Sequence, residues 1–120
     1  MNPISESYQL YREAWKDSAN SKRLMVEAIT VVKQAYECGN REHLLINNYI
    51  ALLLDTQQFQ EAFELLEEYK PESSEFCQNY AIAIANDRYN IDEILKWNKL
   101  ASDYPKNENA IVAYIDWQGF

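Results

Sequence analysis

Apolar residues recur at intervals of three and four positions along almost the whole chain, and strict alternation of apolar and polar residues is absent. This spacing puts apolar side chains on one face of a helix, so it predicts helices rather than strands. We expect seven helices joined by short turns. Their approximate ranges are 5–18, 21–37, 41–55, 57–69, 74–86, 91–103 and 107–117.

The third of these helices is apolar almost all round, because Leu44, Ile46, Tyr49 and Leu53 lie on different faces. A helix of this kind is buried on more than one side, so we expect it at the centre. Short turns make successive helices antiparallel neighbours. The sequence thus predicts an all-α fold and a single domain over residues 1–120. Its hairpins would span about 5–37, 41–69 and 74–103, with a C-terminal helix at about 107–117.

The composition is that of one globular domain, with 120 residues, of which 48% are hydrophobic and 25% are charged. Two glycines and three prolines are too few for glycine-rich phosphate loops or a disordered chain. The first residues lack the basic and apolar regions of a signal peptide, and the longest apolar run is too short to cross a membrane. We therefore expect a cytoplasmic protein without membrane contact, in which Cys38 and Cys77 are reduced and buried.

Acidic residues are concentrated in the middle of the chain. The net charge is −8, and residues 37–93 hold twelve acidic residues against three basic ones. Direct binding of nucleic acid is disfavoured, because phosphate contacts need clustered lysine and arginine. The acidic stretch is either a solvated set of helix faces or a docking surface for a basic partner.

The segment NNYIALLLDTQQFQEAFELLEEYKP resembles a tetratricopeptide repeat. Phe59 and Ala62 match the aromatic–x–x–Ala step that opens the second helix of such a repeat, and Ala28 fits the same pattern one repeat earlier. The resemblance covers about residues 5–105, although no pair has the glycine of that family. It implies stacked helical hairpins in a right-handed array. The alternative is an irregular helical bundle.

The resemblance also implies a groove lined by the first helix of each pair, with Asn48 and Asn79 at corresponding positions in it. An amide both donates and accepts hydrogen bonds, which suits the binding of a partner's backbone. Some family members clamp a partner's C-terminal carboxylate with cations, but Glu13 and Asp17 stand near those positions here. A partner that offers cations fits better. Asn48 and Asn79 could instead be ordinary exposed helix residues.

Residues for catalysis or metal binding are scarce. His43 is the only histidine, and the two cysteines lack C-x-x-C spacing, so a zinc site and a cysteine–histidine nucleophile are both disfavoured. No serine stands in a nucleophile elbow. We expect neither an enzyme nor a bound cofactor or metal.

A small, acidic, helical protein without catalytic groups fits a dedicated inhibitor of a basic protein. Our leading hypothesis is an immunity protein that covers a cationic, nuclease-like toxin domain, similar to the immunity partners of bacterial contact-dependent inhibition toxins. One alternative is a tetratricopeptide-like adaptor or secretion chaperone that holds a peptide in its groove. Another is a structural subunit that associates through its apolar C-terminal helix. The candidate partner-binding residues are Asn48, Glu61, Glu64, Glu67, Glu68, Glu72, Glu75, Asn79 and Trp117.

Overall fold

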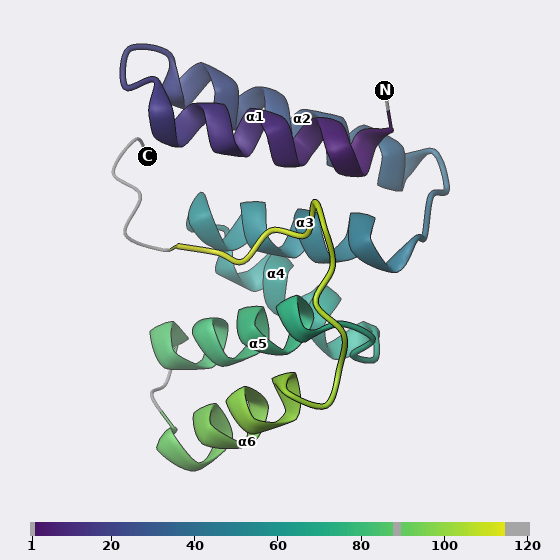
Figure 1. Cartoon of the computed structure of the whole chain (residues 1–120), viewed down its shortest axis with the longest axis vertical. Helices are drawn as coiled ribbons and strands as arrows, with labels where there is room; N and C mark the ends of the chain where they lie inside the picture. The colour runs from purple at the N-terminus through teal and green to yellow at the C-terminus, as the bar shows by residue number, and fades with distance from the viewer. Residues whose placement is uncertain (1, 88–89, 115–120) are drawn as a thin grey trace.

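The computed structural model describes residues 2–87 and 90–114, whose helices form three antiparallel pairs (Figure 1). Over these residues the chain contains helices and no strand, which confirms the all-α prediction. The helices are α1 (Pro3–Lys16), α2 (Ser21–Glu37), α3 (His43–Asp55), α4 (Phe59–Glu68), α5 (Ser74–Asp87) and α6 (Ile91–Ala101).

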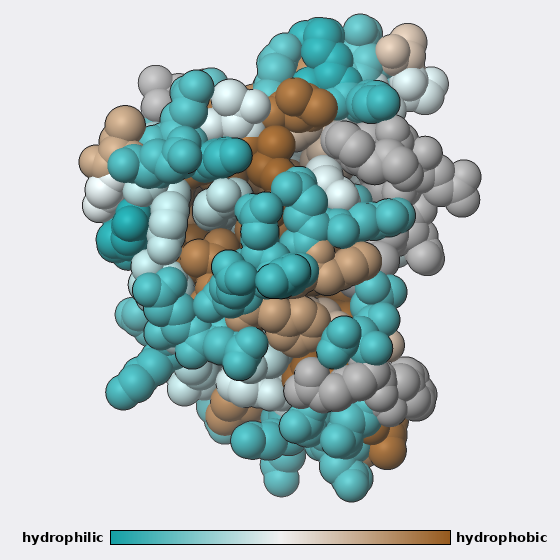
Figure 2. Space-filling view, turned by 180° about the vertical axis from the view of Figure 1, so that it is seen from behind, coloured by the Kyte–Doolittle hydropathy of each residue, from teal (hydrophilic) through white to brown (hydrophobic). Residues whose placement is uncertain are grey.

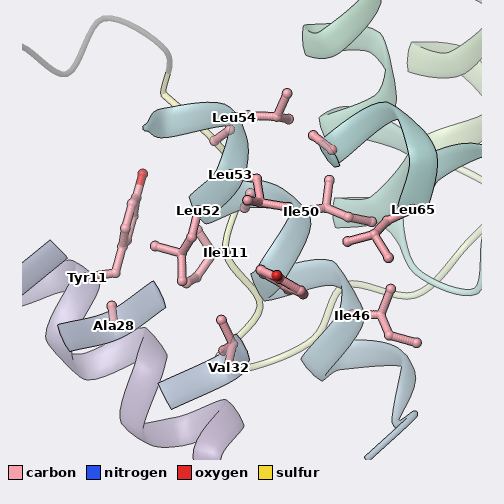
Figure 3. Packing of buried hydrophobic residues seen from close by; sticks show 14 of the residues in the cluster. Tyr11, Ala28, Val32, Ile46, Ile50, Leu52, Leu53, Leu54, Leu65 and Ile111 are labelled. Atoms are coloured by element: carbon pink, nitrogen blue, oxygen red, sulfur yellow. The ribbon is translucent and has the colours of Figure 1, made fainter. Parts of the chain in front are cut away.

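The three pairs are stacked along the long axis of a body that measures 38 × 29 × 23 Å (Figure 1). Helix α3 is in the middle and contacts α1, α2, α4 and α5. Every residue from Leu45 to Asp55 is buried, as expected for a helix that is apolar almost all round. Figure 3 shows the core side chains gathered around this helix.

Helix ends follow local sequence signals. Gly39 has a φ of 102° after α2, and the Asn40 amide returns to the Ala35 carbonyl at 3.0 Å. Only glycine adopts this conformation at little cost, so Gly39 ends the helix. At the start of α6 the Asn90 side chain accepts a hydrogen bond from the Glu93 amide at 3.2 Å. These caps separate helices that apolar spacing alone would merge.

The seventh helix expected at about 107–117 is wrong over its described part, because residues 110–114 are not helical. Ile111 and Ala113 are buried whereas Tyr114 is exposed, the alternation of an extended chain. Figure 1 shows this segment crossing in front of α3 as an irregular trace. We call residues 105–114 the C-terminal strap.

The strap avoids the helical form because other groups bind its backbone. A helix of about ten residues is marginal in water without favourable tertiary contacts. Here side chains of α3 and α5 form hydrogen bonds with amide and carbonyl groups of the strap backbone. The Ile111 side chain lies in the core (Figure 3). Asn109 turns the chain with a φ of 65°, a left-handed value that asparagine tolerates. Among the described helices none is both long and apolar enough to cross a membrane.

Candidate functional site

Three buried asparagines form a hydrogen-bonded row between α3 and α5. Asn47, Asn48 and Asn79 have no exposed surface. Asn79 Nδ2 donates to Asn47 Oδ1 at 3.0 Å, and Asn47 Nδ2 donates to Asn48 Oδ1 at 3.2 Å. Because each amide carries two donor hydrogens and an oxygen with two lone pairs, the row retains capacity for further partners. We call these three residues the asparagine row.

The asparagine row binds the main chain of the strap. Asn48 Oδ1 accepts from the Ile111 N–H at 2.9 Å, and Asn79 Oδ1 accepts from the Ala113 N–H at 2.8 Å. Asn47 Nδ2 and Asn79 Nδ2 each donate to the Ile111 carbonyl at 3.0 Å. The strap is therefore held as a bound extended peptide would be, through backbone groups at alternate positions.

Two of the predicted partner-binding residues thus have their partner within the chain. Asn48 and Asn79 do lie on the same groove, but they are neither open to a partner nor exposed helix residues. Glu75 is also buried, and its two carboxylate oxygens accept from the backbone and side-chain nitrogens of Asn107 at 3.1 and 3.3 Å. The expectation that these three residues form an exposed binding surface is therefore wrong for this structure.

A buried carboxylate lies under the last described residue of the strap. Asp55 Oδ1 accepts from the Tyr114 N–H. Burial raises the pKa of Asp55 to about 6, although the nearby Tyr11 hydroxyl and the hydrogen bond from the Tyr114 amide act in the opposite direction. The Tyr114 ring meets Trp15 edge-on, with centroids 5.2 Å apart. The end of the strap therefore covers the Asp55 carboxyl group, which would ionise more readily if it were exposed to water.

A second feature lies between α2 and α4, where three neighbouring hollows share lining residues and form one surface groove. Figure 1 shows these helices behind α1 and α3, on the opposite side from the strap. Figure 2 looks at this side, where hydrophilic residues surround patches of apolar atoms. We call this feature the acidic groove. Its lining residues are Ile29, Thr30, Lys33, Tyr36, Tyr49, Leu53, Gln57, Gln58, Phe59, Gln60, Glu61, Glu64, Leu65 and Glu68.

Carboxylates dominate the charge of the acidic groove. Helix α4 contributes Glu61, Glu64 and Glu68, and Lys33 is the only cation among the lining residues. Within the described residues no ion pair engages these three carboxylates. Burial, together with the charge of Glu61, raises the pKa of Tyr49, so its hydroxyl remains a proton donor at neutral pH. The groove can therefore accept a cation on its rim and an apolar group on its floor.

Tyr36, which lines the acidic groove, already contacts a guanidinium from the same chain. Arg41 lies over the Tyr36 ring, with its guanidinium carbon 3.6 Å from the ring centroid. The Tyr36 hydroxyl meets the Tyr69 hydroxyl at 3.0 Å, and burial followed by this hydrogen bond raises the pKa of Tyr36 to about 12. A cation over a tyrosine face is a favourable contact, so the aromatic wall of this groove suits arginine.

The remaining candidate residues do not join this groove. Glu67 and Glu72 are exposed but absent from its lining, and Trp117 lies outside the described residues. His43 packs against Phe76 with centroids 5.4 Å apart, and burial lowers its pKa. His43 therefore packs against the core, and its Nε2 atom is buried without a hydrogen-bond partner among the described residues.

Sequence reasoning missed Asn47, Asp55 and Tyr36. The first two stand in an otherwise apolar helix, and that signal indicates buried polar groups with specific partners. Nothing in the local sequence named those partners, which lie about sixty positions later. Tyr36 stands at an apolar position of α2, but its contact with Arg41 depends on the turn at Gly39.

The described residues contain no group of three or more His, Cys, Asp or Glu side chains arranged to hold a metal ion. Comparison with known proteins gives no further guide to function. No family model, no curated protein and no solved structure matches this chain. The proposals that follow therefore rest on the two grooves.

Proposed function

We propose that this chain is a non-catalytic protein-binding module that neutralises a basic partner at its acidic groove. The observation that supports this is the alignment of Glu61, Glu64 and Glu68 beside an aromatic and apolar floor. We further propose that the partner is a cationic toxin domain, nuclease-like in its charge, and that the chain is its immunity protein.

The groove offers two kinds of contact that a basic surface needs. Carboxylates at spacings of three and four lie on one side of a helix, so several can meet lysine or arginine head groups together. Tyr49 and Leu53 supply an apolar floor for the long stems of those side chains. The net charge of −8 would speed the encounter with a cationic partner at low salt.

Inhibition would follow from competition for charge. A nuclease or an RNase binds phosphates through clustered cations. A helix that presents carboxylates to those cations occupies them, so that substrate phosphates can no longer bind. No chemical step is needed. Truncation of one partner in a buried charge pair typically costs about 2–5 kcal/mol of binding free energy. Only a few such pairs are needed for tight binding.

The two alternatives both involve the strap. An adaptor would hold a peptide in the groove that the strap fills here, and a structural subunit would associate through the apolar residues of the C-terminal segment. Ile111 and Ala113 are instead buried against the chain's own helices. This arrangement favours the acidic groove as the site for a basic partner.

The test compares the unaltered chain with a groove variant that carries Glu61→Lys, Glu64→Lys and Glu68→Lys. The matched control carries Glu42→Lys, Glu67→Lys and Glu72→Lys, which change the net charge equally at exposed positions outside the groove. All three proteins are immobilised and exposed to extract of the source organism, followed by elution in steps of increasing salt. A basic protein retained by the unaltered chain and the control, but not by the groove variant, is then purified.

The purified protein is assayed for nuclease activity with and without this chain. Inhibition by the unaltered chain and the control, together with at least a ~100-fold weaker effect of the groove variant, supports the proposal. If the control loses binding as much as the groove variant, the effect is one of total charge and the groove has no special role. If the groove variant and the control both bind the partner as tightly as the unaltered chain does, the proposal is overturned.

A further inference from the structure

We propose that the groove under the strap is a second binding site, for an extended peptide segment of a partner, and that the strap keeps it closed. This groove, which we call the strap groove, is formed by the asparagine row and Asp55. The proposal is independent of the acidic groove, which lies on the other side of the molecule (Figure 1).

The strap groove recognises main chain rather than side chains. Its hydrogen bonds reach the N–H groups of Ile111, Ala113 and Tyr114 and the carbonyl of Ile111. Asn48 Nδ2 adds a hydrogen bond to the Asn109 carbonyl at 2.9 Å. Any extended segment has these groups, so the row does not restrict the groove to the chain's own sequence.

Two buried side chains of the strap indicate which side chains a peptide ligand needs at the corresponding positions. Ile111 is 1% exposed and Ala113 is 5% exposed, whereas Tyr114 is 58% exposed. A ligand therefore needs a medium-sized apolar side chain at the first position and a small one two residues later. It also needs free N–H groups at three of the four positions from Ile111 to Tyr114. Within the described residues no hydrogen bond uses the Val112 N–H, so proline is compatible only there.

The strap lies outside the six described helices, so its release breaks no hydrogen bond within a helix. It follows the last helix of the described chain, and its turn at Asn109 has a left-handed φ of 65°. Its closure also buries the Asp55 carboxylate, which costs free energy when that group is charged. Release would return the carboxylate to water. A competing segment binds with its intrinsic affinity multiplied by the fraction of molecules in which the strap is open.

The experiment uses the full chain and a fluorescent peptide of residues 105–114, PKNENAIVAY. In the chain variant Ala113→Pro every groove residue is retained, but the strap loses the N–H that Asn79 binds. The matched control is Val112→Pro, which removes an N–H that makes no contact with the groove. We expect the Ala113→Pro chain to bind the peptide at least ~10-fold more tightly than the unaltered chain or the control does. A peptide with proline at the position of Ala113 should not bind.

Circular dichroism and urea unfolding establish first that the Ala113→Pro chain is folded. If it is folded and binds no more tightly than the control, the proposal is overturned. Dimerisation of the unaltered chain through its strap, seen as a concentration-dependent mass in light scattering, would identify a second copy as the occupant and also overturn it.

Hydrogen exchange on the unaltered chain gives an answer even if the variant does not fold. The amides of Ile111 and Ala113 should exchange through local opening, at least ~10-fold faster than the amide of Leu52 in the centre of α3. If the strap amides exchange only as fast as that central amide, the strap opens only with global unfolding. The groove is then a part of the core, and the proposal is wrong.

Discussion

The side-chain oxygen of Asn79 accepts a hydrogen bond from the Ala113 amide at 2.8 Å, across 34 positions of sequence. The same side chain donates to Asn47 Oδ1 and to the Ile111 carbonyl, each at 3.0 Å. One buried amide thus joins α5, α3 and the strap. Its loss affects three elements at once.

We expect Asn79→Ala to lower the free energy of unfolding by about 2–4 kcal/mol, because it leaves the Ala113 amide and Asn47 Oδ1 without their partner and removes one of the two donors to the Ile111 carbonyl. Urea unfolding followed by circular dichroism at 222 nm measures this loss. The control is Asn86→Ala, an exposed position near the end of the same helix, for which we expect a change within about 0.5 kcal/mol. Equal effects of the two substitutions would contradict the bonding described for Asn79.

The raised pKa of Asp55 makes stability depend on pH. Its pKa is about 6 in the folded chain and 3.8 in the unfolded chain, so the folded state holds this proton more tightly. The stabilisation from protonation is complete below about pH 4, declines as pH rises through 6, and is absent above. This contribution to the free energy of unfolding is about 3 kcal/mol at its largest.

Asp55→Asn should remove this dependence. We expect the variant to match the unaltered chain near pH 4 and to exceed its stability at pH 7.5, since a neutral amide carries no burial cost of charge. The oxygen of the new amide can still accept from the Tyr114 N–H. Urea midpoints from pH 4 to 7.5 provide the measurement.

His43 has the opposite effect on how the free energy of unfolding of each protein depends on pH. Burial lowers its pKa, so its contribution to stability is present above about pH 6.5 and is lost as pH falls through the folded pKa. His43 is present in both the unaltered chain and the Asp55→Asn variant. Subtracting their free energies of unfolding at each pH therefore removes its contribution and leaves that of Asp55. A difference that is constant across pH would contradict the raised pKa.

The central helix and the strap mark what the sequence could and could not predict. The apolar positions of α3 lie on all its faces, so its burial followed directly from local pattern. The strap carries apolar residues at helical spacing too, but its backbone is bound by asparagines more than thirty positions away. Local periodicity holds no information on such distant hydrogen bonds, and for that reason the helix predicted at 107–117 was wrong over its described residues, 107–114.

The acidic residues illustrate the same distinction for the sites. The concentration of charge between 37 and 93 was visible in the sequence. Which carboxylates share a surface depends on the rotation of α4 about its axis and on the direction in which the chain leaves it. Glu61, Glu64 and Glu68 line the acidic groove, whereas Glu75 turns inward to bind Asn107.

Ala62 provides a test of the close packing between α3 and α4. It is fully buried, and it stands in the aromatic–x–x–Ala step that suggested a repeat. We expect Ala62→Leu to cost about 1–3 kcal/mol of stability, because the larger side chain must push the two helices apart. Gln60→Leu, at an exposed position of the same helix, is the control and should change stability by no more than about 0.5 kcal/mol. A neutral Ala62→Leu would mean that the helices are further apart than described.

The two cysteines should differ sharply in reactivity. Cys38 is exposed at the end of α2, so the expectation that it is buried is wrong. Cys77 is buried in α5 as expected, and burial raises the pKa of its thiol to about 11. Because the thiolate is the reactive species, a disulfide reagent at pH 8 should label one thiol rapidly in the native chain and both in urea. The slow labelling of Cys77 then reports the opening of α5. Cys38→Ser should abolish the rapid phase alone, and a rapid phase that survives this substitution would contradict the burial of Cys77.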